Sequence, residues 1–334
     1  MHAGQRYTLK EFLVWTVSDI KWMVVLSTIP VVLFEVLDLK WIALPWVPIA
    51  LIGTATAFIV GFRNTQTYSR LWEARQIYGA IINTSRSWGM LVKDLIGSHH
   101  AEDAQPAKRE LINRHIAWLT ALRFQLREQR AWETSRTKPS NQKYGQRFVI
   151  DEWTTTLEES LKPYLSAEEL KYIISKSNKA TQLIGRQSQQ LKELKTQGWI
   201  EPLNYVELER LLVDLYDHQG RCERIKNFPY PRQFATISQM LNRLFVVLVP
   251  FGVLNEFQKS GSWMVWLTIP FSAVVGWVFL TLERVGENTE NPFEGGANDV
   301  PVTAISRTIE IDLLEMTDAA EVPKPLTPKN FILT

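Results

Sequence analysis

Three residues spaced four apart, Thr54, Phe58 and Phe62, lie in a stretch (42–62) that contains no charged side chain. In an α-helix, residues at this spacing lie one above another on the same face. An apolar stripe of this kind usually packs in the core of a helix bundle. In a symmetric ring of copies it would instead face the axis, as a hydrophobic constriction that gates by wetting and dewetting. The spacing therefore permits an ion pathway, and the packing alternative stays open.

Residue types that usually carry catalysis form no recognisable constellation in the sequence. The histidines make no HxxxH or HExxH pair, and there is no Walker A loop, GxSxG or GxGxxG (His2, His99, His100, His115, His218). A single cysteine, Cys222, excludes an intramolecular disulfide and a Cys-rich metal site. Glu35 is the one acidic residue clearly inside an apolar stretch, near its end, where it could be functional or snorkel to the interface. A net charge of +2 gives no reason to expect nucleic acid. We therefore predict neither an enzyme nor a metal protein.

Four apolar stretches are long enough to position such a stripe in a membrane. Residues 42–62 contain no charge over 21 positions and residues 263–282 none over 20, and each could cross a bilayer as a helix. Two weaker apolar stretches lie beside them, at 22–37 and 240–257. Short turns at 38–41 and 258–262 join the four stretches into two helical hairpins. The sequence therefore predicts a multi-pass membrane protein.

The distribution of charge predicts the orientation of these spans. The region between the hairpins, residues 63–239, is too charged to cross, so both of its flanks must lie on one side of the membrane. It holds most of the lysines and arginines, and the N-terminal segment adds Arg6, Lys10 and Lys21. The positive-inside rule places both termini and this central region in the cytoplasm.

Apolar periodicity predicts that the central region is helical. Long helices are expected at 63–97, 107–134, 166–196 and 203–226, and no strand pattern stands out. Ser166 and Glu169 form a capping-box pattern at the start of the third helix, and Pro202 suits the first position of the fourth. The predicted fold is all-α, with four spans whose long helices continue into a cytoplasmic bundle.

Five segments follow from this pattern. They are an N-terminal segment with the first hairpin, the cytoplasmic helical region, the second hairpin, a segment with a short amphipathic helix at 303–316, and a Pro-rich tail expected to be disordered (1–62, 63–239, 240–282, 283–317, 318–334).

Two motifs connect this pattern with a known family. "GFRNTQTYSRLWEAR" at 61–75, and "NPF" at 291–293 followed by "ANDVP" at 297–301, together with the four-span arrangement, resemble the bestrophin family. The resemblance is closest to its bacterial members and extends from about residue 10 to about residue 317. It implies a homopentameric ion channel around one axial pore, in the inner membrane of a bacterium. The implied partners are copies of the same chain, membrane lipid and the permeant ions.

The resemblance also assigns site residues. The family's narrow hydrophobic neck falls on Thr54, Phe58 and Phe62. A second constriction, the cytoplasmic aperture, falls on Leu203 when the chain is aligned through Gly198, Tyr205 and "RCER" at 221–224. The remaining assigned residues form a belt segment around the channel (Asn291, Pro292, Phe293, Asn298, Asp299).

Two departures from the family pattern bear on function. The first neck position is usually branched aliphatic, whereas the hydroxyl of Thr54 could bond a backbone carbonyl one turn away or face the lumen. Animal members follow "NPF" with an acidic run that ligates calcium, whereas this chain has only Glu294 and Asp299 in "EGGAND". Calcium takes six to eight oxygen ligands, so we predict no calcium clasp and no cofactor.

The residue types at the two constrictions do not determine which ions pass. No ring of charge lies at either constriction, so electrostatics favours neither sign of ion. The family implies chloride or other anions, toward which aromatic rings can present their positive edges. The alternatives are a monovalent cation channel of the same fold, passing sodium, and a non-conducting membrane scaffold.

Overall fold

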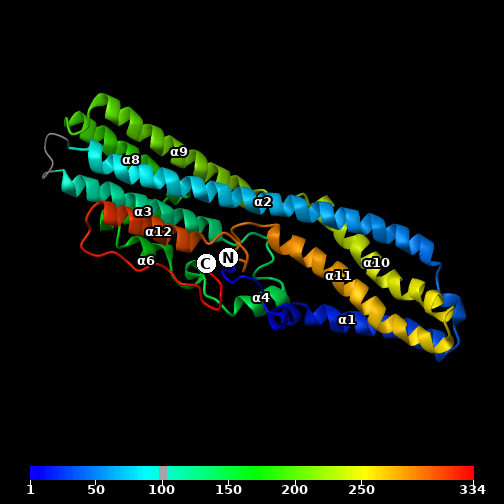
Figure 1. The fold of residues 1–334 in the computed structure, drawn as a ribbon. Coiled ribbons are helices and arrows are strands. Elements are labelled where there is room, and N and C mark those ends of the chain that lie inside the picture. The colour runs from blue at the N-terminus through cyan, green and yellow to red at the C-terminus, as the bar shows by residue number, and fades with distance from the viewer. Residues whose placement is uncertain (98–103) are drawn as a thin grey trace. The chain divides into compact units, whose positions relative to one another are not determined.

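The computed structural model describes residues 1–97 and 104–334 and shows a helical protein in two compact units. The span unit comprises residues 4–70 and 229–291, and the helical unit comprises residues 1–3, 71–228 and 292–334. The described residues form helices and a few isolated bridges but no strand, which confirms the all-α prediction (Figure 1). His99 and His100 and most of the predicted loop around them lie outside the described residues.

The span unit contains the four helices that are long and apolar enough to cross a membrane. They are joined in two hairpins, as the sequence predicts. The 3₁₀ turn at 40–42 overlaps the predicted turn at 38–41, whereas the one at 262–267 lies almost wholly inside the stretch predicted as a span, 263–282. Their bounds are α1 (Leu9–Glu35), α2 (Trp46–Leu95), α10 (Arg232–Gln258) and α11 (Thr268–Thr289). The protein is therefore a membrane protein.

Two of these helices begin earlier than the apolar stretches suggest. α1 starts at Leu9 because Thr8 and Glu11 form a capping box, in which each side chain accepts a hydrogen bond from the other residue's backbone N–H. α10 starts at Arg232, directly after Pro231. The predicted segment boundaries at 62 and 239 consequently fall inside α2 and α10 rather than at helix ends.

Close approach of the helices in the span unit depends on glycine. A Cβ at Gly276 of α11 would lie 2.1 Å from Cε of Met23 on α1, and one at Gly53 of α2 would lie 2.5 Å from the ring of Phe245 on α10. Small residues at such crossings let the helix backbones approach.

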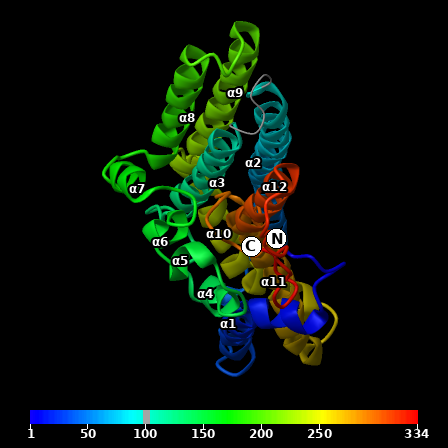
Figure 2. The ribbon, with the colours of Figure 1, turned by 90° about the vertical axis from the view of Figure 1, so that its left-hand side faces the viewer.

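Among the described residues, the helical unit is built from the second half of α2 and eight further helices. The long ones are α3 (Gln105–Arg127), α8 (Lys179–Thr196) and α9 (Pro202–Asn227), which Figure 2 shows side by side. The shorter ones are α4 (Pro139–Gly145), α5 (Asp151–Thr154), α6 (Leu157–Leu161), α7 (Ala167–Ile174) and α12 (Val302–Met316). Trp88, His115 and Trp118 are fully buried in its core. Burial lowers the pKa of His115 to about 3, so this histidine is a neutral core residue.

Several predicted helix bounds are wrong in this unit. The helix expected over 107–134 ends at Arg127, and the one expected over 166–196 is two helices, α7 and α8. One of the two hydrogen bonds of the predicted capping box forms, since Glu169 N donates to Oγ of Ser166. The Glu169 carboxylate instead accepts from Nε of Arg114 at 2.5 Å and does not reach back to the cap. Pro202 does occupy the first position of α9.

The Pro-rich tail forms no helix or strand and is held by backbone hydrogen bonds. Its last residues pair with the N-terminal segment, where Ala3 N donates to Phe331 O at 2.7 Å and Leu333 N to Met1 O at 2.8 Å. Ile332 is buried, and Ala304 N at the start of α12 donates to Thr334 O at 2.8 Å. These backbone hydrogen bonds fix a proline-rich segment that forms no helix of its own.

Candidate pore neck, aperture and belt

The predicted neck residues lie on the face of α2 that its own chain leaves uncovered. Phe58 is 76% exposed, Phe62 is 48% exposed and Thr54 is also exposed. α2 packs through another face, on which Val60 and Arg63 are buried. The stripe is therefore not part of the core of this chain. This excludes the alternative that the three side chains pack inside a single protomer.

The hydroxyl of Thr54 takes the first of its two possible orientations. Thr54 Oγ1 donates to the carbonyl oxygen of Ala50 at 3.0 Å. With its proton committed to the backbone, the side chain presents mainly its methyl group on the stripe, much as a branched aliphatic residue would.

A buried group of charges lies next to Phe62. Nη2 of Arg63 donates to Oε2 of Glu290 at 2.6 Å, and both side chains are almost fully buried. The other carboxylate oxygen of Glu290 lies 2.6 Å from Nη2 of Arg232, which is half-exposed. The sequence identified Arg63 only as the first charge beyond the stripe. Its partners escaped prediction because they lie more than 160 residues away along the chain, with no motif linking them.

The predicted aperture residue lies at the start of α9. Leu203 follows Pro202 and is 80% exposed, and Val206 on the next turn is also exposed. Neither side chain is therefore packed in the core of the helical unit.

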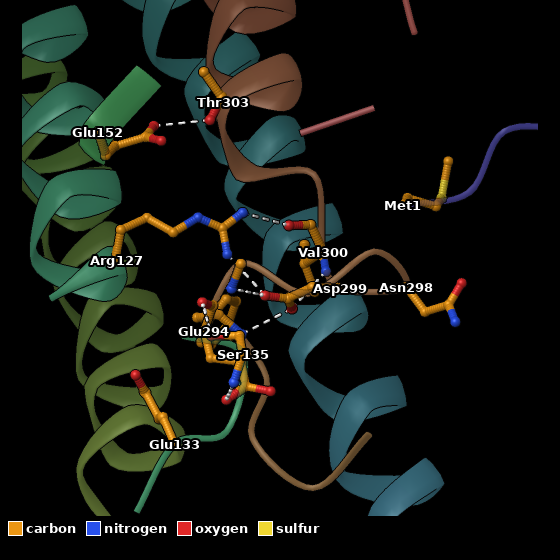
Figure 3. Close-up of polar contacts among 12 residues, drawn as sticks. Met1, Arg127, Glu133, Ser135, Glu152, Glu294, Asn298, Asp299, Val300 and Thr303 are labelled. Carbon is orange, nitrogen blue, oxygen red and sulfur yellow. Dashed lines mark hydrogen bonds and ion pairs between the residues drawn. The ribbon is translucent and has the colours of Figure 1, made fainter. Parts of the chain in front are cut away.

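The belt segment is a tight turn organised by Asp299 (Figure 3). Oδ1 of Asp299 accepts from the backbone N–H groups of Phe293 at 2.8 Å and Val300 at 2.7 Å. Oδ2 accepts from the N–H of Gly295 and from Nη1 of Arg127, both at 2.7 Å. Asp299 and Arg127 are both buried, so this is an internal ion pair in which every carboxylate lone pair faces a donor.

The "NPF" residues are buried, as a packed belt requires. Asn291, Pro292 and Phe293 are all covered, whereas Asn298 is exposed. Phe293 has a φ of +72°, in the left-handed region, which costs energy for an aromatic residue. Its ring is fully buried and lies 5.6 Å from that of Tyr78, so packing holds the unusual backbone.

Glu294, which follows "NPF", is a buried carboxyl group. Its Oε2 accepts from the backbone N–H groups of Thr134 at 2.9 Å and Ser135 at 3.3 Å (Figure 3). The pKa of Glu294 is raised from 4.5 to about 8, chiefly by burial and also by the nearby carboxylates of Asp299 and Glu133, against the lowering effect of the two N–H groups. Glu294 therefore titrates near neutral pH.

The surroundings of Asp299 bear on the predicted lack of a calcium clasp, which stays a prediction. Asp299 already faces four donors, and Arg127 places a guanidinium beside it. A divalent cation would have to displace these donors and approach a fixed positive charge.

Comparison with known proteins agrees with this architecture. A family model described as "Bacterial/Fungal Bestrophin protein" matches residues 12–315. The "Voltage-dependent anion channel-forming protein YneE" of Escherichia coli (strain K12) is 27% identical over 288 residues, which cover 86% of this chain and 82% of that protein. The "Voltage-dependent anion channel-forming protein mll4386" of Mesorhizobium japonicum is 25% identical over 285 residues, covering 85% and 79%. Both names describe channels rather than enzymes.

A solved structure shares the fold. The crystal structure of a bacterial bestrophin homolog from Klebsiella pneumoniae superposes with a TM-score of 0.76 at 24% identity, covering 91% of this chain and 99% of that one. The family model spans all four membrane helices and the belt. The chain therefore belongs to the bestrophin family, in its bacterial and fungal branch.

Proposed function

We propose that the chain assembles as a homopentamer in the inner membrane of a bacterium and conducts small monovalent anions, chloride foremost. The observation that carries this proposal is the uncovered stripe of Thr54, Phe58 and Phe62 on α2. In a ring of copies, the stripe would line the axis as a narrow apolar neck that conducts when it is wetted. The curated relatives, named as anion channels, support this use of the stripe.

Leu203 forms the second constriction in this proposal. Its side chain is free to meet its counterparts from the other copies at the cytoplasmic end of the ion path. Both constrictions are then apolar, and both chain termini lie in the cytoplasm with the basic central region.

Selectivity for anions would come from the edges of the phenylalanine rings. Phe58 and Phe62 carry no charge, but the positive edge of an aromatic ring favours an anion that has lost part of its hydration shell. A sodium-conducting channel of the same fold is the alternative, since the stripe itself contains no charged residue.

The belt in this proposal works without calcium. The Arg127 guanidinium supplies the positive charge that the Asp299 carboxylate needs, and backbone N–H groups fill its remaining lone pairs. The turn is therefore complete before any ion binds.

Currents through the purified protein in planar bilayers under a KCl gradient test the neck. Phe58→Ala should raise conductance or change selectivity, because it removes a ring of side chains from the narrowest part of the path. Phe271→Ala is the matched control, since it removes a similarly exposed phenylalanine from α11. The sign of the reversal potential distinguishes anion from cation conduction. Silence of both the unaltered protein and Phe58→Ala, with a pentamer confirmed by mass, would leave the scaffold as the better function.

A further inference from the structure

The ion pair between Arg63 and Glu290 lies where it could prevent α2 from rotating about its own axis. On α2, Arg63 follows Phe62 directly, so the two side chains point about 100° apart around the helix axis. Phe62 lies on the uncovered face, whereas Arg63 is 2% exposed and points into the span unit. Whatever fixes the direction of Arg63 therefore also fixes the direction of Phe62.

Three contacts tie this turn of α2 to the end of α11. Arg63 pairs with Glu290, Nδ2 of Asn64 donates to the carbonyl of Leu282 at 3.0 Å, and Oγ1 of Thr289 donates to Oγ1 of Thr67 at 2.9 Å. Only the first contact joins two opposite charges in a buried place, so it is the strongest of the three.

Glu290 connects more than these two helices. Its second oxygen binds Arg232, the first residue of α10, so one carboxylate bridges α2, α10 and the end of α11. Removing this carboxylate would leave Arg63 buried without its ion-pair partner, and with only the more distant carboxylate of Glu283 on α11 to compensate its charge. Turning Arg63 toward water would relieve part of this cost. Such a turn would move Phe62 with it.

We propose that Glu290 is the positioning residue of the neck: by bridging Arg63 and Arg232 it fixes the rotation of α2 and thereby aims Phe62 at the ion path. This inference rests on the proposed function, because it assigns Phe62 to a constriction. It adds a residue that lies outside the neck stripe and acts through Arg63.

The first test compares currents of Glu290→Gln with those of the unaltered protein. Gln keeps the size and one acceptor of Glu290 but loses its charge. We expect a shift in reversal potential under a KCl gradient, and no further shift when Glu290→Gln is added to Phe62→Ala. Asp19→Asn is the matched control, because it breaks the 2.6 Å pair between Asp19 of α1 and Arg284 of α11 without touching α2. Full additivity with Phe62→Ala would overturn the inference.

A second variant covers the case in which Glu290→Gln does not fold. Combining Arg63→Met with Glu290→Leu removes both charges of the buried pair, a replacement that proteins often tolerate well. The Arg63–Glu290 ion pair, which we call the tether, is still lost in this double variant. We expect this double variant to shift the reversal potential in the same direction as Glu290→Gln. Currents identical to those of the unaltered protein would contradict a positioning role.

A spectroscopic measurement makes the outcome independent of conduction. A nitroxide attached to Phe62→Cys, in a Cys222→Ala background, reports distances between copies in the assembled protein. We expect both tether variants to shift or broaden these distances and Asp19→Asn to leave them unchanged. Unchanged distances in the tether variants would refute the inference whatever the currents show. A silent unaltered protein with shifted distances would count against the proposed channel and not against the tether.

Discussion

At the scale of single residues, the site is determined by which side chains are covered. Phe58 and Phe62 are large apolar groups left uncovered on a helix that packs through another face. Glu294 is the converse, a carboxyl group that is almost fully buried. Burying a carboxyl group costs free energy and favours its neutral form. Uncovered phenylalanines on a membrane-spanning helix cost little, because lipid can cover them, and a ring of copies would replace that lipid by protein.

The titration of Glu294 leads to a prediction about pH. The folded protein keeps the Glu294 proton up to about pH 8, whereas the unfolded chain loses it near 4.5. Because the unfolded state binds fewer protons in this range, the free energy of unfolding should fall as the pH rises from about 4.5 to about 8. Glu294→Gln should flatten this dependence, because an amide accepts the same backbone N–H groups without titrating.

Thermal unfolding midpoints across this pH range, in detergent, measure the effect. Glu207→Gln, which changes an exposed glutamate paired with Arg210, is the control and should keep the slope of the unaltered protein. A Glu294→Gln variant with that same slope would show that Glu294 does not hold its proton in the belt.

At the scale of elements, α2 shows which features of a helix the sequence alone predicts. The charge-free span at 42–62 and the apolar periodicity over 63–97 together predicted one helix passing from the lipid into the cytoplasmic region, and α2 is unbroken from Trp46 to Leu95. The common face of Phe58 and Phe62 was also predictable, because their i, i+4 spacing is local, but the sequence left open whether that face is packed or exposed. Local patterns of this kind survive folding because a helix preserves them.

Contacts between distant elements were beyond prediction. Arg127 and Asp299 are 172 residues apart, and neither residue's surroundings in the sequence indicate that they meet. The same holds for Arg63 with Glu290, and for the tail, whose pairing depends on the N-terminal segment. Such pairs depend on how helices pack, which the periodicity of one helix does not determine.

The belt turn gives a second prediction. Asp299→Asn replaces a carboxylate that accepts from four donors with an amide whose NH₂ group would face two of them. Breaking a buried ion pair by removing one partner typically costs about 3–5 kcal/mol, so the thermal midpoint should fall markedly. The control is Asp312→Asn, which breaks a more exposed pair with Arg86 in the same unit and should cost less than about 1 kcal/mol.

Adding calcium extends this measurement to the proposed absence of a calcium clasp. The unaltered protein should melt at the same temperature with calcium and with a chelator, since Arg127 already neutralises Asp299. A calcium-dependent rise in the melting temperature would assign an ion to the belt and contradict this part of the proposal.

At the scale of the whole molecule, the exposed apolar residues of α9 support the proposed assembly. Leu203, Val206 and Val213 are all more than half exposed, in the unit rich in charged residues where lipid would not cover them. Exposed apolar residues gathered on one helix are typical of a surface that contacts another protein. Other copies of this chain would cover it if the rings proposed at Phe58 and Leu203 form.

Cross-linking at Leu203 tests this assembly directly. If five copies place Leu203 around one axis, Leu203→Cys should bring thiols of different copies within reach of one another, and mild oxidation should give disulfide-linked dimers with reduced current, because each chain offers one reactive thiol. The native Cys222 is buried and burial raises its pKa, so it should not compete. Gln189→Cys, at an exposed position on α8, should remain monomeric on the same non-reducing gel. Equal cross-linking of the two variants, or none at Leu203→Cys, would mean that Leu203 does not line a shared axis, and the aperture would have to be sought elsewhere on α9.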